Sequence, residues 1–269
     1  MSMLRRTCFT GLLATVVLLA GCAVTPPPAP TPEARVALTP TGVLRVGVYA
    51  GSPTSLVSDK QGRNAGVAHD LGREFARWLN SPFQLVEFNR IAEVIEAMKA
   101  GEVDFTFTNA TDARARDVDF TLPLVSLELG YLVPPGSKLR NASEIDRVGT
   151  KVGVSQGSTS HGVLSRAYRQ AQVVPVPTLK TAIDQLRLGQ LDAFATNKGI
   201  LFEMSDNLPG ARVLEGRWGL ENLAIAVPKG RQAGLSYLSL FARTVRRDGT
   251  LEAAIARAGL RGTVEPGQR

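Results

Sequence analysis

The chain has 269 residues, 44% of them hydrophobic and 20% charged, with a formal net charge of +7 and a mean hydropathy of +0.02. This composition is that of a globular protein and excludes a disordered, fibrous or multi-span membrane chain. Two cysteines and two histidines are too few for a disulfide scaffold, a four-cysteine zinc site or a histidine-rich metal centre. The basic residues are scattered rather than clustered, so we expect no nucleic acid as a partner, and we expect no metal or cofactor.

The N-terminal residues have the pattern of an export signal. A basic start precedes the apolar run Gly11–Ala20, which is too short to cross a bilayer and is typical of a secretory signal peptide. The run ends in Leu-Ala-Gly-Cys at 19–22, which resembles the lipobox of bacterial lipoproteins. That resemblance implies a signal peptide over 1–21 and lipid attachment to Cys22. A soluble secretory signal, in which Cys22 happens to follow two small residues, is the alternative.

A proline-rich segment follows the signal. Residues 22–41 contain the stretch TPPPAPTPEARVALTP, whose composition favours extended polyproline II structure. The sequence therefore predicts a linker that lifts a folded body off a membrane surface, with the body beginning near Gly42.

The folded body alternates strands with amphipathic helices. Strands are predicted over 43–49, 83–88 and 103–108, and helices over 67–79 and 91–100 separate them. This β-α-β-α-β order favours right-handed crossovers and a parallel sheet.

The same pattern occurs a second time further along the chain. Residues 94–106 (VIEAMKAGEVDFT) and 183–195 (IDQLRLGQLDAFA) both contain an apolar helix, a glycine, an aspartate and a strand. We interpret this as a structural duplication that builds two α/β lobes with a ligand cleft between them. The predicted lobes are 42–130 plus 224–262 and 131–223, connected by strands that cross between them.

Six segments in order along the body resemble one known family. They are LRVG at 44–47, GVAHDL at 66–71, TDAR at 111–114 with DFT at 119–121, VGVSQGST at 152–159, GQLD at 189–192 and DGTL at 248–251. Together they resemble the bacterial periplasmic solute-binding proteins of amino-acid-binding family 3, which have the type II periplasmic-binding fold. The resemblance implies a two-lobed α/β fold, each lobe a mostly parallel sheet flanked by helices, with the ligand cleft between the lobes.

The resemblance also implies a function and a location. A protein of this kind captures a small polar solute in the cleft and delivers it to an ABC permease in the inner membrane. We expect a monomeric, periplasmic lipoprotein anchored in the membrane, with no cofactor and no catalytic activity.

Arg114 is the main candidate ligand residue. Its guanidinium has five donors in a planar fork that suits a carboxylate, and it follows Thr111 in a loop after a strand, where open α/β sheets bind ligands. A surface arginine paired with Asp112 or Asp117 is the alternative interpretation.

The second lobe is predicted to supply donors at a helix start. Gly157, Ser158 and Thr159 precede a predicted helix whose free amide groups and dipole favour an anion. Helix capping alone is the alternative for these hydroxyls. The further candidate ligand residues are Tyr49, Thr108, Asn109, Thr111 and Asn197.

The sequence departs from the family at the place that binds an ammonium group. Amino-acid binders usually have an aspartate after the sixth strand, and the matching position here is the neutral Asn197. A site with an arginine, hydroxyls and amides but no carboxylate suits an anion better than a zwitterion, because a buried unpaired ammonium is costly. We therefore predict a small carboxylate or another polar anion as the ligand, with an α-amino acid as the alternative.

Two other function classes share the fold. A periplasmic dehydratase-like enzyme would need an acid in the cleft, and the acidic candidates are Glu128, Glu203 and Glu221. Each of the three is expected at a surface or a helix cap, which argues against catalysis. A free-standing ligand sensor is the other alternative.

Overall fold

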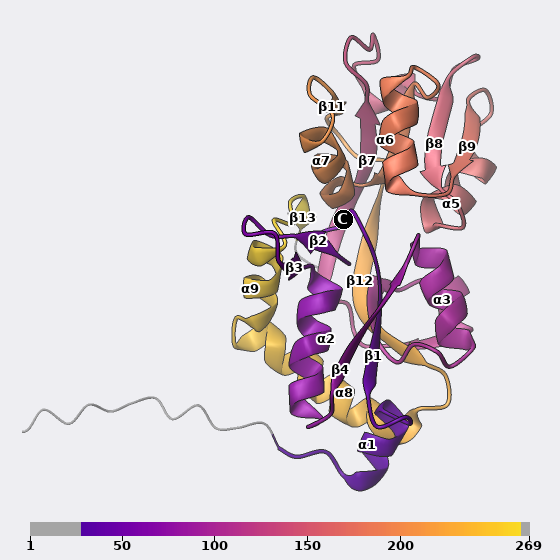
Figure 1. Ribbon diagram of the computed structural model, residues 1–269. Coiled ribbons are helices and arrows are strands. Elements are labelled where there is room, and N and C mark those ends of the chain that lie inside the picture. The colour runs from indigo at the N-terminus through magenta and orange to yellow at the C-terminus, as the bar shows by residue number, and fades with distance from the viewer. Residues whose placement is uncertain (1–27, 265–269) are drawn as a thin grey trace, which may run out of the picture.

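The computed structural model describes residues 28–264, which form two lobes joined by long crossing strands (Figure 1). Lobe 1 contains α1 (Pro32–Leu38), β1 (Leu44–Tyr49), β2 (Val57–Ser58), β3 (Asn64–Ala65), α2 (Val67–Trp78), β4 (Phe83–Phe88), α3 (Ile91–Lys99), β5 (Thr106–Asn109), α4 (Asp112–Ala115), β6 (Val118–Phe120), α8 (Gln232–Arg247) and α9 (Thr250–Arg257). Lobe 2 contains a 3-10 helix (Ala142–Glu144), β8 (Lys151–Ser155), α5 (Thr159–Ala167), β9 (Gln172–Val176), α6 (Leu179–Arg187), β10 (Ala193–Asn197), α7 (Lys198–Asp206) and β11 (Arg212–Val213). The crossing strands are β7 (Val125–Val133) and β12 (Gly219–Pro228), and β13 (Thr263–Val264) pairs with β7.

Parallel pairs form the interior of each lobe, and antiparallel pairs form where the chain crosses. Strand β1 pairs in parallel with β4, and β8 pairs in parallel with both β9 and β10. Strand β12 runs antiparallel to β5, β6 and β7, and β7 runs antiparallel to β10. The predicted parallel β-α-β units are therefore present, while β7 and β12 make the sheet mixed at the centre of the molecule.

The duplication predicted from the sequence has a structural counterpart. The Asp104 carboxylate accepts a hydrogen bond from the backbone N–H of Arg45, at 3.0 Å, near the start of β1. The Asp192 carboxylate accepts one from the backbone N–H of Lys151, at 2.8 Å, at the start of β8. In both lobes, the aspartate of the repeated motif thus holds the beginning of the first strand.

Helix α1 corrects the predicted linker. The sequence predicts extended chain up to residue 41, and this is wrong over Pro32–Leu38. Thr31 caps the helix through its side chain and proline is tolerated in the first turn, so Thr-Pro begins a helix here. Leu38 is 1% exposed, and Arg231 donates to the carbonyls of Ala37 and Leu38 at the C-terminal end of α1. This segment is therefore part of lobe 1.

The lobe 1 core is rich in aromatic rings. Phe75 on α2 packs against Phe241 on α8 with ring centroids 4.7 Å apart, and Trp78 meets the same ring edge-on at 5.1 Å. These contacts hold the C-terminal helices against the N-terminal part of the lobe. They explain how two segments far apart in the sequence form one lobe.

The predicted signal peptide and Cys22 lie outside the described residues. Within 28–264, no helix combines the length and the apolar character that a membrane span requires. The described chain begins beside lobe 1, where the Tyr237 hydroxyl donates to the carbonyl of Pro28 at 2.9 Å.

Candidate functional site

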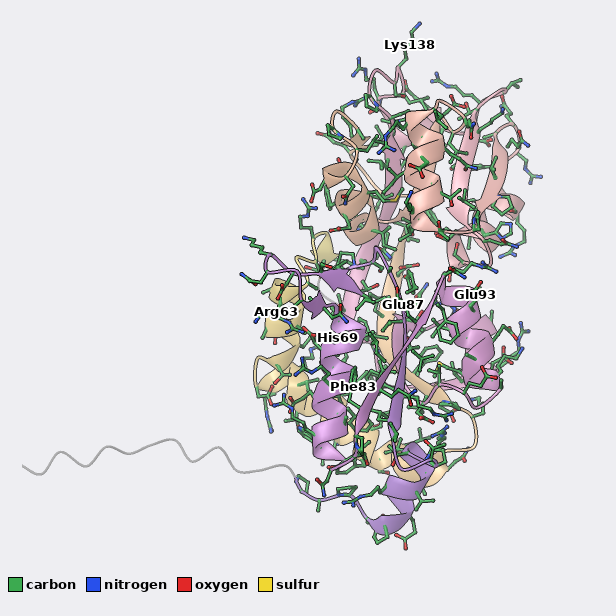
Figure 2. All side chains as sticks on the ribbon, in the orientation of Figure 1. Arg63, His69, Phe83, Glu87, Glu93 and Lys138 are labelled. Atoms are coloured by element: carbon green, nitrogen blue, oxygen red, sulfur yellow. The ribbon has the colours of Figure 1, made fainter. Side chains whose placement is uncertain are left out.

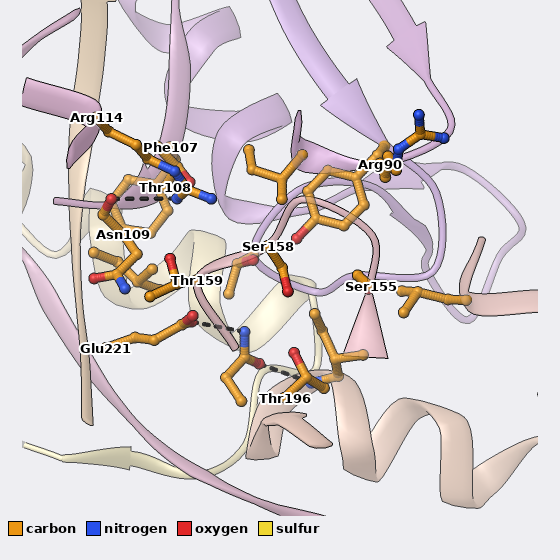
Figure 3. A pocket seen from close by; sticks show the side chains of 17 residues that line it. Arg90, Phe107, Thr108, Asn109, Arg114, Ser155, Ser158, Thr159, Thr196 and Glu221 are labelled. Carbon is orange, nitrogen blue, oxygen red and sulfur yellow. Dashed lines mark hydrogen bonds between the residues drawn. The ribbon is translucent and has the colours of Figure 1, made fainter. Parts of the chain in front are cut away.

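A pocket lies between the two lobes, and both lobes and the crossing strand β12 line it (Figure 3). Its walls combine hydroxyl and amide side chains with apolar ones and three charged groups. The lining residues are Tyr49, Thr54, Arg90, Ile91, Phe107, Thr108, Asn109 and Arg114 from lobe 1, Ser155, Ser158, Thr159, Leu179, Thr196, Asn197 and Ile200 from lobe 2, and Glu221 and Leu223 from β12.

Arg114 lies on the lobe 1 wall at the end of the short helix α4. Thr111 caps this helix by accepting a hydrogen bond from the Arg114 backbone N–H at 3.3 Å. One guanidinium nitrogen, Nη1, donates to the Thr108 hydroxyl at 2.7 Å and to the Asn109 carbonyl at 3.3 Å (Figure 3). These bonds orient the fork and leave its other donors for a ligand. Burial lowers the pKa of Arg114, and the charge of Glu221 opposes this shift.

Glu221 brings a carboxylate into the same pocket. Its side chain lies on β12 and is buried, with the residue 8% exposed. Burial raises the pKa of Glu221, while the hydrogen bond from Asn197 and the charge of Arg114 lower it. The expectation that Glu221 sits at a surface or a helix cap is wrong, and so is the argument that the site has no carboxylate.

Asn197 positions this carboxylate. Its Nδ2 donates to Glu221 Oε2 at 3.0 Å, and its Oδ1 accepts from the Ile200 backbone N–H at 3.0 Å, which caps α7 (Figure 3). Both ends of the amide are therefore in use. Asn197, at the position that matches the family's aspartate, is therefore not the acid of this site but a hydrogen-bond donor to its acid, Glu221.

The helix start on lobe 2 offers fewer free donors than the sequence predicts. Ser158 Oγ accepts from the His161 backbone N–H at 3.1 Å, which caps α5. The Gly157 N–H donates to His161 Nδ1 at 3.1 Å, and the Ser158 N–H donates to the Ser155 carbonyl at 3.0 Å. Ser158 and Thr159 line the pocket, whereas Gly157 lies beside it. The donors facing the pocket thus come from Ser158 and Thr159.

The lobes touch next to this helix start. Gly157 has a φ of +74°, and a Cβ built on it would lie 2.8 Å from the Ala92 Cβ of lobe 1. A Cβ on Gly51 of lobe 1 would lie 3.4 Å from Leu179 of lobe 2. The two lobes are therefore in contact beside the pocket.

The remaining predicted ligand residues divide into two groups. Tyr49, Thr108 and Asn109 line the pocket, whereas Thr111 is the N-cap residue of α4. Burial raises the pKa of the Tyr49 hydroxyl. Its hydrogen bonds to the Ser52 and Thr54 side chains act in the opposite direction and lower this pKa. Asn109 Oδ1 accepts from the backbone N–H of Asn222 on β12 at 3.1 Å, so it joins the lobe 1 wall to the crossing strand.

The other two candidate acids and His69 have structural contacts elsewhere. Glu128 pairs with Lys198 at 2.5 Å and with Arg217 at 3.2 Å, and Glu203 borders a separate groove beside α6 and α7. His69 lies inside lobe 1 (Figure 2), edge-on to Phe83 with ring centroids 5.6 Å apart. Burial lowers the pKa of His69 to about 4. These groups do not line the interlobe pocket.

The fold and the pocket together define a two-lobed solute-binding protein. Residues 44–259 match the family described as bacterial extracellular solute-binding proteins, family 3, and the chain belongs to this family. It is 24% identical over 198 residues to the ABC transporter glutamine-binding protein GlnH of Bacillus subtilis (strain 168), covering 72% of each protein. An extracellular solute-binding role follows from this membership.

Solved structures show the same fold. A mutant of ArgBP from T. maritima superposes with a TM-score of 0.75 at 23% identity, covering 84% of this chain and 99% of that one. The ancestral amino acid-binding protein AncCDT-1, a precursor of cyclohexadienyl dehydratase, gives a TM-score of 0.72 at 22% identity, covering 82% and 97%. At these identities, the likeness concerns the fold alone.

Proposed function

We propose that this protein is the substrate-binding component of an ABC importer and that it binds an α-amino acid as a zwitterion in the interlobe pocket. The observation that carries this proposal is the presence of one half-buried guanidinium, Arg114, and one buried carboxylate, Glu221, on the walls of the same pocket. The relative in Bacillus subtilis, an ABC transporter glutamine-binding protein, supports both the transport role and the ligand class.

The two charged groups suit the two charges of an amino acid. Arg114 would hold the α-carboxylate through the donors that Thr108 and Asn109 leave open, and Ser158 and Thr159 would add hydroxyls from lobe 2. Glu221, held by Asn197, would accept from the α-ammonium group. Ligand contacts from both lobes would stabilise the form in which the lobes touch.

A simple anion suits the pocket less well. It would pair with Arg114 but leave the buried Glu221 carboxylate facing another negative charge, and a buried unpaired charge is costly. A zwitterion satisfies both groups at once. We therefore propose the α-amino acid rather than the anion that the sequence alone favours.

Membrane anchoring through Cys22 is part of the proposal. The described chain begins beside lobe 1, where α1 packs on α8, so an anchor at residue 22 would hold lobe 1 near the membrane. Expression of the full-length chain and of Cys22→Ser in a Gram-negative host with labelled palmitate should label the first chain and not the second. Absence of label in the unaltered chain, or equal label in both, would contradict lipid attachment at this residue.

Thermal shift and calorimetry with matched solutes test the binding function. The protein is first unfolded and refolded to release any copurified ligand, and then titrated with the common α-amino acids. For each amino acid that binds, we expect the analogues lacking the amino or the carboxyl group to bind at least about 100-fold more weakly. An organic acid without an amino group that binds as tightly as its amino acid would refute the zwitterion site.

The burial of Glu221 favours a second candidate function. A carboxyl group with a raised pKa beside an arginine that binds carboxylates could protonate a leaving hydroxyl, as a dehydratase requires. The structural likeness to a precursor of cyclohexadienyl dehydratase makes prephenate and arogenate the substrates to test. Turnover that Glu221→Gln abolishes would favour the enzyme, and tight amino-acid binding without turnover would favour the transport protein.

A further inference from the structure

We propose that the bound amino acid has an uncharged side chain with a hydrogen-bonding group, and that this pocket selects against cationic amino acids. This inference rests on the proposed function and concerns the part of the pocket that Arg114 and Glu221 leave for the side chain. The first argument is the number of charges. Among the described residues that line the pocket, Glu221 is the single acid, and the two cations are Arg90 and Arg114.

Glu221 cannot serve two cations. In the proposed pose, its carboxylate accepts from the α-ammonium group, and Asn197 already donates to it. The guanidinium of arginine or the ammonium of lysine would then enter the pocket without a counter-ion. The loss of hydration of such a group outweighs its contacts with neutral side chains.

Arg90 supplies no partner for a charged ligand side chain of either sign. It lies on the pocket wall at the start of α3, and its Nε is buried without a hydrogen-bond partner among the described residues. Arg90 is also paired with Glu93 at 2.6 Å, and its guanidinium points away from the other labelled side chains in Figure 3. It is therefore poorly placed to receive an acidic side chain.

Neutral polar groups make up much of the remaining pocket wall. Ser155 and Thr196 lie on the other side of Ser158 from Arg114 (Figure 3). Thr196 is 6% exposed and directly precedes Asn197 at the end of β10. The Thr54 hydroxyl, on lobe 1, also lines the pocket and is already hydrogen bonded to the Ser52 hydroxyl at 2.9 Å. A hydroxyl, thiol or carboxamide on the ligand would find partners here, beside the apolar contacts of Leu179 and Ile200.

The test compares classes of side chain and then changes one wall residue. Calorimetry on refolded protein uses serine, threonine, cysteine, asparagine and glutamine against arginine, lysine, histidine, aspartate, glutamate and leucine. We expect the tightest-binding amino acid of the first, neutral polar group to bind at least about tenfold more tightly than every amino acid of the second group. For that ligand, Thr196→Val should weaken binding by about tenfold, the usual scale for one lost hydrogen bond. Thr150→Val, at a buried threonine of lobe 2 outside the pocket, is the matched control and should leave the affinity unchanged.

A charged variant gives the opposite readout. Thr196→Asp places a second carboxylate on the pocket wall, so arginine or lysine should gain affinity while the neutral ligand loses it. Tighter binding of a cationic, acidic or aliphatic amino acid by the unaltered protein would overturn the proposed selectivity and leave the amino-acid function standing. An unchanged affinity in Thr196→Val would overturn the role of this wall. Absence of binding by every amino acid would instead refute the proposed function, and the selectivity with it.

Discussion

The two ends of the interlobe pocket are built in different ways. At one end, Arg114, Thr108 and Asn109 come from one stretch of chain, and short-range hydrogen bonds orient the guanidinium. At the other end, Glu221 on the crossing strand and Asn197 on lobe 2 are 24 positions apart and meet only in the folded molecule. The first end is therefore a local motif, and the second depends on how β12 passes between the lobes.

This difference matters for how the pocket responds to closure. The Arg114 guanidinium keeps its orientation within lobe 1, because its hydrogen bonds to Thr108 and Asn109 lie in that lobe. The acid end joins a crossing strand to a strand of lobe 2. We infer that the carboxylate group of a ligand binds to a surface that is already formed within lobe 1. Binding of its ammonium group depends on the relative position of the two lobes.

Removing the arginine should have the largest effect. Arg114→Ala deletes the proposed partner of the ligand carboxylate, and we expect a loss of at least about 100-fold in affinity, near 3 kcal/mol. Arg114→Lys keeps the charge but not the planar fork, so it should restore only part of the binding. Calorimetry measures both, and circular dichroism confirms the fold. An unchanged affinity in Arg114→Ala would remove this residue from the site.

Moving the acid should have the next largest effect. Glu221→Gln removes the partner of the ligand ammonium, and we expect a loss of roughly 30-fold in affinity. Asn197→Asp alone should not improve binding, because two carboxyl groups at hydrogen-bond distance share a proton. The double variant Glu221→Gln, Asn197→Asp exchanges the amide and the acid, and it should recover part of the lost affinity. If the double variant bound the ligand more weakly than Glu221→Gln, a carboxylate at position 197 could not replace the one at position 221.

Separating the lobes should have the smallest effect. Gly157→Ala places a methyl group against Ala92, so it should favour the open form and weaken binding by several-fold. Gly101→Ala is the matched control, because Gly101 has a similar φ of +72° but no atom within 4 Å of the added Cβ. Both variants carry the strain of a positive φ, of about 1 kcal/mol. Equal affinities in the two variants would show that the lobe contact does not contribute to binding.

The sequence was sufficient for the local features of the site. The motif around Arg114 placed it directly after a strand, although the structure has the short helix α4 there instead of the predicted loop. The residues before α5 predicted the cap that Ser158 forms. The repeated aspartates predicted two related lobes, and Asp104 and Asp192 make matching bonds in the structure. Each of these depends on neighbours in the chain or on a pattern that occurs twice.

The sequence was not sufficient for Glu221, although a signal was present. The residue pattern alone predicts a crossing strand over 222–227, which begins three residues after the start of β12 at Gly219 and leaves out Glu221. Side chains alternate along a strand, so residues 221 and 223 share a face, and both line the pocket. Extending the strand by three residues would have placed an acid on the same face as a buried leucine. The pairing of that acid with Asn197 still depends on the path of β12 between the lobes.

Helix α1 was missed for a different reason. The prolines of the linker outweighed the helix-forming residues after Pro32, although proline is well tolerated at the first position of a helix. Burial of Leu38 against α8 and the Arg231 contacts stabilise the helix, and neither is visible in a local pattern.

A crystal structure of the complex with the tightest-binding amino acid tests the central claim most directly. We predict the α-carboxylate within hydrogen-bond distance of the Arg114 guanidinium and the α-nitrogen within the same range of the Glu221 carboxylate, about 2.7–3.2 Å in each case. A ligand bound between the lobes with its nitrogen remote from Glu221, or with Arg114 facing no carboxylate, would contradict the account.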